Sequence, residues 1–90
     1  MGDNEAAWGV LKHPLMTEKA IGLVEKENKL TFIVNRQCNK RQIKDAVEKL
    51  FAVKVARVTS EITRDGTKKA YVRLSKEFSA SEIATRLGML

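Results

Sequence analysis

The chain has 90 residues, 43% hydrophobic and 31% charged, with a formal net charge of +6. A chain of this length builds one hydrophobic core rather than two, and the proportions are those of a globular protein. No apolar run reaches the roughly 20 residues of a membrane-spanning helix, and the acidic first residues do not fit a signal or transit peptide, so we expect a cytoplasmic protein without a membrane span.

Cysteine and histidine each occur once, as Cys38 and His13. A single cysteine cannot form an intramolecular disulfide, and the pair does not have the spacing of a metal site. No serine or cysteine nucleophile can be assigned to His13. We therefore expect no metal, no cofactor, no small-molecule substrate and no enzymatic activity.

Residues 1–9 show no sustained periodicity and are interpreted as a loose lead-in to a single domain spanning residues 10–90. Val10-Leu11-Lys12 has the composition of a short edge strand, which we expect to end before His13-Pro14. Thr17 is a suitable N-cap for a helix that ends near Lys26. The apolar side of this predicted helix contains Ala20, Ile21 and Val24.

A strand is predicted from Lys29 to Asn35, because Leu30, Phe32 and Val34 alternate with the remaining residues and define one strongly buried face. The next helix has a continuous apolar stripe at helical spacing. Asn39, with Gln42 three residues later, matches a capping box at its start. The stripe consists of Ile43, Ala46, Val47, Leu50 and Phe51.

The segments Val53–Thr63 and Lys68–Leu74 both alternate with period two and predict a hairpin. Both inward sets must share one face, which requires a loop of odd length, and Arg64-Asp65-Gly66 fits a three-residue turn that ends in a left-handed glycine. The expected inward residues are Ala56, Val58, Ser60 and Ile62 in the first strand and Ala70, Val72 and Leu74 in the second. The resulting register places Arg57 opposite Arg73, Val58 opposite Val72, Thr59 opposite Tyr71 and Glu61 opposite Lys69.

A terminal helix is predicted after Ser79, where Ser79-Ala80-Ser81-Glu82 resembles a second capping box and Gly88 is a suitable C-cap. Its apolar positions are Ile83, Ala84 and Leu87. The element order (β)αβαββα does not alternate regularly as in a parallel sheet. We therefore expect an α+β fold, with a four-stranded antiparallel sheet and helices on one or more of its faces.

The positive charge is regional, because residues from Arg36 to Lys76 include 12 basic and 4 acidic side chains and the remainder has a net charge of −2. Clustered cations are typical of nucleic-acid binding, although a charged face can also serve only solubility. Lys40 and Arg41 lie in the first turn of the second helix, where the macrodipole disfavours cations and favours a bound phosphate. The alternative is an exposed ion pair between Arg41 and Asp45.

The predicted hairpin contributes two further groups of cations. Arg57 and Arg73 are like charges directly opposite each other, which is unfavourable unless an anion lies between them. Tyr71 shares their face and can stack on an RNA base or pack under a helix. The remaining three cations, at the tip, can contact phosphates or protect a strand edge from pairing, and they are Arg64, Lys68 and Lys69.

Four segments together resemble the universal large-subunit ribosomal protein twenty-three family, over residues 8–90. The Pro-x-x-Thr-Glu-Lys and Lys-Lys-Ala-Tyr-Val motifs carry most of this resemblance. The hairpin does not have the long bacterial-type insertion, and the first residues are acidic rather than a long basic extension, so an archaeal-type member fits best. The segments are residues 12–20, Asn28-Lys29-Leu30-Thr31-Phe32, residues 40–51 and residues 65–74.

The resemblance implies a structural ribosomal protein at the rim of the polypeptide exit tunnel. Its implied partners are large-subunit rRNA, ribosomal protein twenty-nine, and the signal recognition particle or another exit-site factor, for which Glu18 is a candidate docking residue. Val58-Thr59-Ser60 replaces the Val-Asn-Thr of many members, so a contact made by that asparagine is not expected. The predicted rRNA-binding residues are Lys12, His13, Thr17, Lys19, Lys40, Arg41, Lys44, Arg57, Arg64, Lys68, Lys69, Tyr71 and Arg73.

Two alternative functions stay open at this point. A free-standing RNA-recognition module requires an aromatic-rich central strand, whereas Tyr71 is the one aromatic residue at the outward hairpin positions. An acylphosphatase-like enzyme requires a glycine-rich phosphate loop with a positioned arginine and asparagine, and the sequence contains no such loop. Both alternatives fit the sequence less well than a ribosomal protein.

Overall fold

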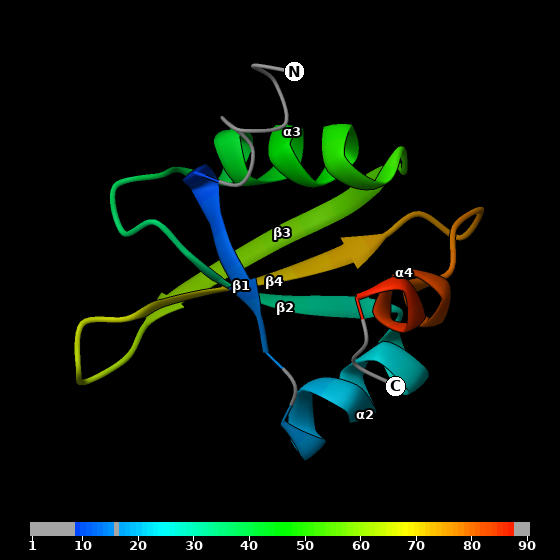
Figure 1. Ribbon diagram of the computed structural model, residues 1–90, viewed down its shortest axis with the longest axis horizontal. Coiled ribbons are helices and arrows are strands. Elements are labelled where there is room, and N and C mark those ends of the chain that lie inside the picture. Colours follow the sequence, from blue (N-terminus) through cyan, green and yellow to red (C-terminus); the bar gives the residue numbers. More distant parts are fainter. Residues whose placement is uncertain (1–8, 16, 88–90) are drawn as a thin grey trace.

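A computed structural model describes residues 9–15 and 17–87 of the chain (Figure 1). It confirms the predicted α+β class, with a four-stranded antiparallel sheet and three helices in the predicted order. No helix in these residues is long and apolar enough to cross a membrane. The elements are β1 (Leu11–Pro14), α2 (Glu18–Glu27), β2 (Lys29–Val34), α3 (Lys40–Phe51), β3 (Val55–Ile62), β4 (Lys68–Leu74) and α4 (Ala80–Arg86).

The sheet has the strand order β1-β2-β4-β3, so β2 and β4 are central and β1 and β3 form the edges. Helix α3 lies along one face, and α2 and α4 lie together at the end of the sheet where β2 begins and β4 ends (Figure 1). The core between them is continuous, and Phe32 stacks on Phe51 with ring centroids 6.1 Å apart. Its largest fully buried side chains are Phe32, Leu11, Leu30, Ile43, Val34, Val47 and Val72.

The starts of α2 and α3 are confirmed at the level of individual hydrogen bonds. Thr17 Oγ1 accepts from the backbone N–H of Ala20 at 3.2 Å. At α3, Asn39 Oδ1 accepts from the N–H of Gln42 and Gln42 Oε1 accepts from the N–H of Asn39, both at 2.9 Å. Because these bonds satisfy donors that would otherwise have no partner, each cap fixes the first turn of its helix.

The hairpin has the predicted register, with Arg57 opposite Arg73, Val58 opposite Val72, Thr59 opposite Tyr71 and Glu61 opposite Lys69. Its loop is also the predicted one, because the N–H of Thr63 donates to the carbonyl of Thr67 at 2.8 Å and that of Gly66 to Thr63 at 3.0 Å. Gly66 has a φ of +85°, a conformation that glycine adopts without strain.

Two of the expected inward positions in β3 are wrong. Ala56 is exposed and Val55 is buried in its place, because a bulge between Val55 and Arg57 shifts the alternation by one residue. Ile62 has the inward phase but is 57% exposed, since it ends β3 where nothing in the described part of the chain covers it.

The predicted end of β1 is also wrong, because the strand runs from Leu11 through Pro14 and does not include Val10. Pro14 is tolerated as its last residue because β1 is an edge strand and one of its sides needs no backbone donor. A bulge between Leu11 and His13 interrupts its pairing with β2.

Strand β2 is buried on both faces rather than on one. Its inward residues are buried as predicted, and Thr31 and Ile33, which point the other way, are 2% and 9% exposed. Leu15 and Ala20 line the same small hollow as Thr31, so the segment entering α2 covers this part of the second face. The hydroxyl of Thr31 has no hydrogen-bond partner among the described residues.

The predicted capping box at Ser79 is wrong, because its side chain forms no capping hydrogen bond. Asn28 replaces it, with Oδ1 accepting from the N–H of Ala80 at 2.7 Å. The C-cap of α4 is Leu87, and the predicted C-cap Gly88 lies outside the described residues.

Candidate nucleic-acid interface

The face of β2, β4 and β3 that points away from α3 is called the outer face. Strand pairing arranges its side chains in rows of three, one residue from each strand. On this face the β2 side chains Thr31 and Ile33 are buried, whereas the side chains on β4 and β3 are half-buried or exposed. The rows are Lys29-Arg73-Arg57, Thr31-Tyr71-Thr59 and Ile33-Lys69-Glu61.

The first row consists of three cations. Arg57 and Arg73 are exposed and form no ion pair with any residue that the structure describes. Lys29 lies 3.2 Å from the carboxylate of Glu27. The row forms one side of a hollow that Thr59 and Tyr71 complete. This arrangement concentrates positive charge at an open site.

Tyr71 is held by an acidic neighbour on the same face. Its hydroxyl donates to Glu61 Oε1 at 2.6 Å. This hydrogen bond, with burial and the negative charge of Glu61, raises the pKa of Tyr71 to about 12. Glu61 lies opposite Lys69 but forms no ion pair with it. The phenol is therefore neutral at ordinary pH and its polar end is already engaged.

The cations at the hairpin tip have different environments. Arg64 is exposed in the loop, whereas Lys68 is half-buried and its Nζ donates to the backbone carbonyl of Cys38. Asp65 hydrogen-bonds to the Thr63 hydroxyl and to the N–H of Thr67, and these bonds lower the pKa of its carboxyl. Lys68 thus ties the hairpin to the segment before α3, and Arg64 is the more accessible cation.

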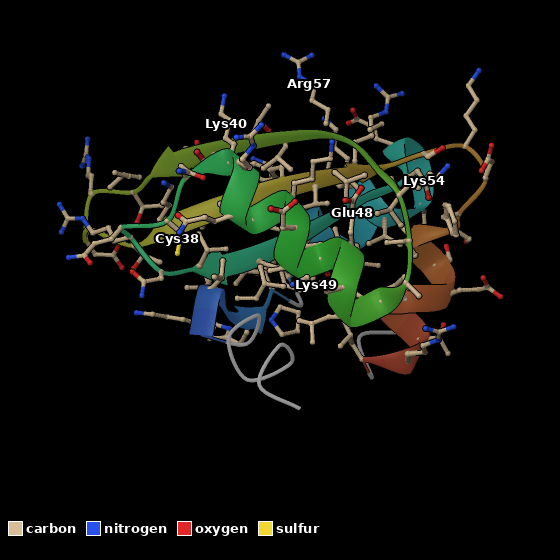
Figure 2. The ribbon with its side chains drawn as sticks, turned by 90° about the horizontal axis from the view of Figure 1, so that it is seen from above. Cys38, Lys40, Glu48, Lys49, Lys54 and Arg57 are labelled. Carbon is tan, nitrogen blue, oxygen red and sulfur yellow. The ribbon has the colours of Figure 1, made fainter. Side chains whose placement is uncertain are left out.

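At the start of α3, Lys40, Arg41 and Lys44 are all exposed. No ion pair joins Arg41 to Asp45, so the alternative explanation for Arg41 is absent from this structure. Figure 2 shows Lys40 and Arg57 pointing outward on the same side of the molecule. The start of α3 is therefore a group of exposed cations separate from the row on the outer face.

The N-terminal candidates separate into two groups. Lys12 and His13 are exposed on β1 and line a broad hollow together with Arg36 and Lys68. Thr17 forms the cap of α2, and Glu18 and Lys19 are exposed in the first turn of that helix.

In the described residues, no group of three or more His, Cys, Asp or Glu side chains could hold a metal ion.

Comparison with known proteins assigns this chain to a family. Residues 9–66 match the family model described as Ribosomal protein L23. The chain belongs to the ribosomal protein L23 family. It is also similar to the large ribosomal subunit protein uL23 of the archaeon Caldivirga maquilingensis, with 58% identity over 76 residues, which cover 84% of this chain and 88% of the relative. The resemblance to an archaeal-type member is confirmed, and the family is one of ribosomal proteins rather than enzymes.

Two basic residues of this L23 family member are not among the predicted rRNA-binding residues. Lys29 joins the arginine row because β2 pairs with β4, and its outward phase in the predicted strand was the available signal. Arg36 lines the hollow beside the hairpin tip, where its guanidinium lies close to Gly66. Nothing local in the sequence indicated this contact, because the two residues belong to different loops.

Proposed function

We propose that the protein is a structural constituent of the large ribosomal subunit that binds large-subunit rRNA through phosphate contacts. Membership of the ribosomal protein L23 family is the observation that carries the proposal. The exposed cations at the start of α3 support it, since they have no acidic partner among the described residues. Such contacts supply most of the affinity of a basic protein for RNA and fix its orientation.

The start of α3 is suited to a phosphate for two reasons. Lys40 and Arg41 supply charge, and a helix N-terminus is itself an anion-binding position. The capping box occupies two backbone donors, those of Asn39 and Gln42, and leaves the cations exposed. A phosphate there would offset the unfavourable position of the two cations beside the positive end of the helix dipole.

We further propose that the protein lies at the rim of the polypeptide exit tunnel of cytoplasmic ribosomes, beside ribosomal protein twenty-nine. Glu18 and Lys19 at the start of α2 are exposed, as a docking element for the signal recognition particle or another exit-site factor requires. Glu18 also lies in the first turn, where an acidic side chain suits the helix dipole. A role in helix stability and a role in docking are therefore compatible.

The test is sedimentation of the tagged protein in cells of its source or in a reconstituted large subunit. We expect it to remain with the large subunit through a high-salt wash. A wholly free pool that still binds RNA fragments without preference would support a free-standing RNA-binding module instead. Filter binding to transcribed large-subunit rRNA over a range of salt concentrations should give a steep log–log slope.

A further inference from the structure

Three cations in the first row of the outer face, Lys29, Arg73 and Arg57, are directly opposite one another on adjacent strands. Side chains at such positions have Cβ atoms about 5 Å apart, and like charges there are destabilising. The sheet contains this repulsion twice, once on each side of Arg73. Of the three, only Lys29 is next to an acidic partner in the described residues, Glu27 at 3.2 Å.

The second row limits which groups can meet an anion in this hollow. Tyr71 lines it, but its hydroxyl donates to Glu61, which lies in the third row, away from the arginines. The available donors are the two guanidinium groups, the Lys29 ammonium and the Thr59 hydroxyl. Guanidinium groups suit phosphate because their planar donors match its oxygens, and the hydroxyl adds a neutral donor.

The lining of the hollow favours a nucleic-acid strand over a small metabolite. Tyr71 forms part of its wall next to the cations, so an aromatic ring and phosphate-binding groups occur together. A ribose or base can rest on such a ring while the adjacent phosphate contacts the arginines. An acidic protein segment would satisfy the charges, but its carboxylates do not recur at the regular spacing of the charges along a phosphodiester chain.

We propose that Lys29, Arg57, Arg73 and Thr59 bind a backbone phosphate of an RNA strand that crosses the outer face of the sheet. The proposal rests on the proposed function and extends it, because it makes the sheet a second contact surface beside the start of α3. Lys29 turns from Glu27 toward the phosphate when RNA is bound. Tyr71 contributes its ring to the wall of the site, and Glu61 keeps its hydroxyl away from the anion.

The experiment is filter binding of the full chain to transcribed large-subunit rRNA as a function of salt concentration. The variant Arg57→Gln/Arg73→Gln should reduce the magnitude of the log–log slope by about 0.7 to 0.9, the contribution of one lost phosphate contact. The matched control is Lys54→Gln/Lys76→Gln, which removes the same charge from exposed positions outside the row. Its slope should stay within about 0.5 of wild type.

A second readout separates binding from a structural role. Removing two like charges relieves repulsion, so the thermal midpoint of the free arginine variant should equal or exceed that of wild type. Thr59→Val should weaken rRNA binding while leaving the salt slope unchanged, because it removes a neutral donor. A lowered midpoint together with an unchanged slope would instead make the arginines structural.

The outcomes distinguish this site from the broader function. If rRNA binding by wild type depends steeply on salt and the arginine variant has the same slope, the outer-face site is overturned and the ribosomal function stands. An equal reduction of the slope in the arginine variant and in the control indicates a general charge effect and also overturns the site. Binding of polyglutamate that Arg57→Gln/Arg73→Gln loses, together with an unchanged slope for rRNA, would assign the row to an acidic protein and overturn the proposal. If wild type does not bind rRNA, both proposals fail.

Discussion

Asn28 holds the start of α4 through a hydrogen bond from the Ala80 N–H to its Oδ1, 2.7 Å long. Its Nδ2 donates to the carbonyl of Phe78 at 2.9 Å, and its own backbone ends α2 in the left-handed conformation with a φ of 56°. One side chain thus joins the end of α2, the start of β2 and the start of α4. This position, rather than Ser79, fixes where the last helix begins.

Substitutions of Asn28 test its role in connecting α2, β2 and α4. Asn28→Gly keeps the left-handed backbone accessible but removes the side-chain hydrogen bonds, so we expect the free energy of unfolding to fall by about 2 kcal/mol. In Asn28→Ala the free energy of unfolding should fall by about 1 kcal/mol more, because a positive φ is unfavourable for alanine. Urea unfolding measures both, and a glycine variant as stable as wild type would show that α4 does not depend on this side chain.

Glu48 connects α3 to the irregular start of β3, because its Oε2 accepts from the N–H of Val55 at 3.0 Å (Figure 2). Glu48→Ala leaves that donor without a protein acceptor and should lower the free energy of unfolding by about 1 to 2 kcal/mol. Glu48→Gln retains an acceptor oxygen, so its free energy of unfolding should decrease by less than half as much. Glu25→Ala, at an exposed position on α2, is the control, and a loss as large as that of Glu48→Ala would contradict the assignment.

The Tyr71 to Glu61 hydrogen bond predicts a measurable pH dependence. Tyr71 is the one tyrosine in the chain, so the ultraviolet titration of tyrosinate reports it alone. We expect a midpoint near the raised pKa of about 12 in wild type, and a midpoint closer to 10 in Glu61→Gln, because the carboxylate that favours the neutral phenol is removed. Glu77→Gln, at an exposed turn position, should leave the titration unchanged.

The sign of the accompanying stability change follows from the same shift. Because the pKa of folded Tyr71 lies above its value in the unfolded chain, the hydrogen bond contributes fully below about pH 10. Its contribution is lost as the pH rises toward about 12. The free energy of unfolding should therefore decrease more for wild type than for Glu61→Gln over this interval. The same decrease with pH in both proteins would contradict a stabilising role of the hydrogen bond.

Lys40 and Arg41 should show opposite effects on stability and on binding. Lys40→Ala/Arg41→Ala removes two cations from the positive end of the α3 dipole, so the free protein should gain a few tenths of a kcal/mol, up to about 1 kcal/mol. The same variant should reduce the salt slope for large-subunit rRNA by about 1 to 2 units. Lys54→Ala/Lys76→Ala is the matched control, and an unchanged slope in the test variant would remove the helix start from the interface.

The elements and the hairpin register could be predicted because local rules determine them. Alternation fixed the phase of β3 and β4, and the required odd loop ending in Gly66 left one register. The capping boxes show the limit of the same approach. Asn39 and Ser79 begin similar four-residue patterns, but at Ser79 a side chain more than fifty positions earlier supplies the acceptor, which no local pattern records.

The candidate surface was only partly predictable for a similar reason. Arg57 and Arg73 could be paired because a short hairpin joins their strands, whereas Lys29 joins their row through the long-range pairing of β2 with β4. The bulge before Arg57 adds one residue without a compositional signal, so Ala56 was placed inward and Val55 overlooked. Local patterns therefore predict the strands, whereas the strand order of the sheet determines which side chains become neighbours on the outer face.

The irregular edges of the sheet affect whether copies of the chain associate with one another. A regular edge strand exposes unpaired backbone groups that a second chain can extend into a larger sheet. Here β1 is bulged between Leu11 and His13 and ends on Pro14, and β3 is bulged between Val55 and Arg57. Both edges are therefore poor templates for intermolecular strand addition, so free copies of the chain should resist aggregation through their sheet edges.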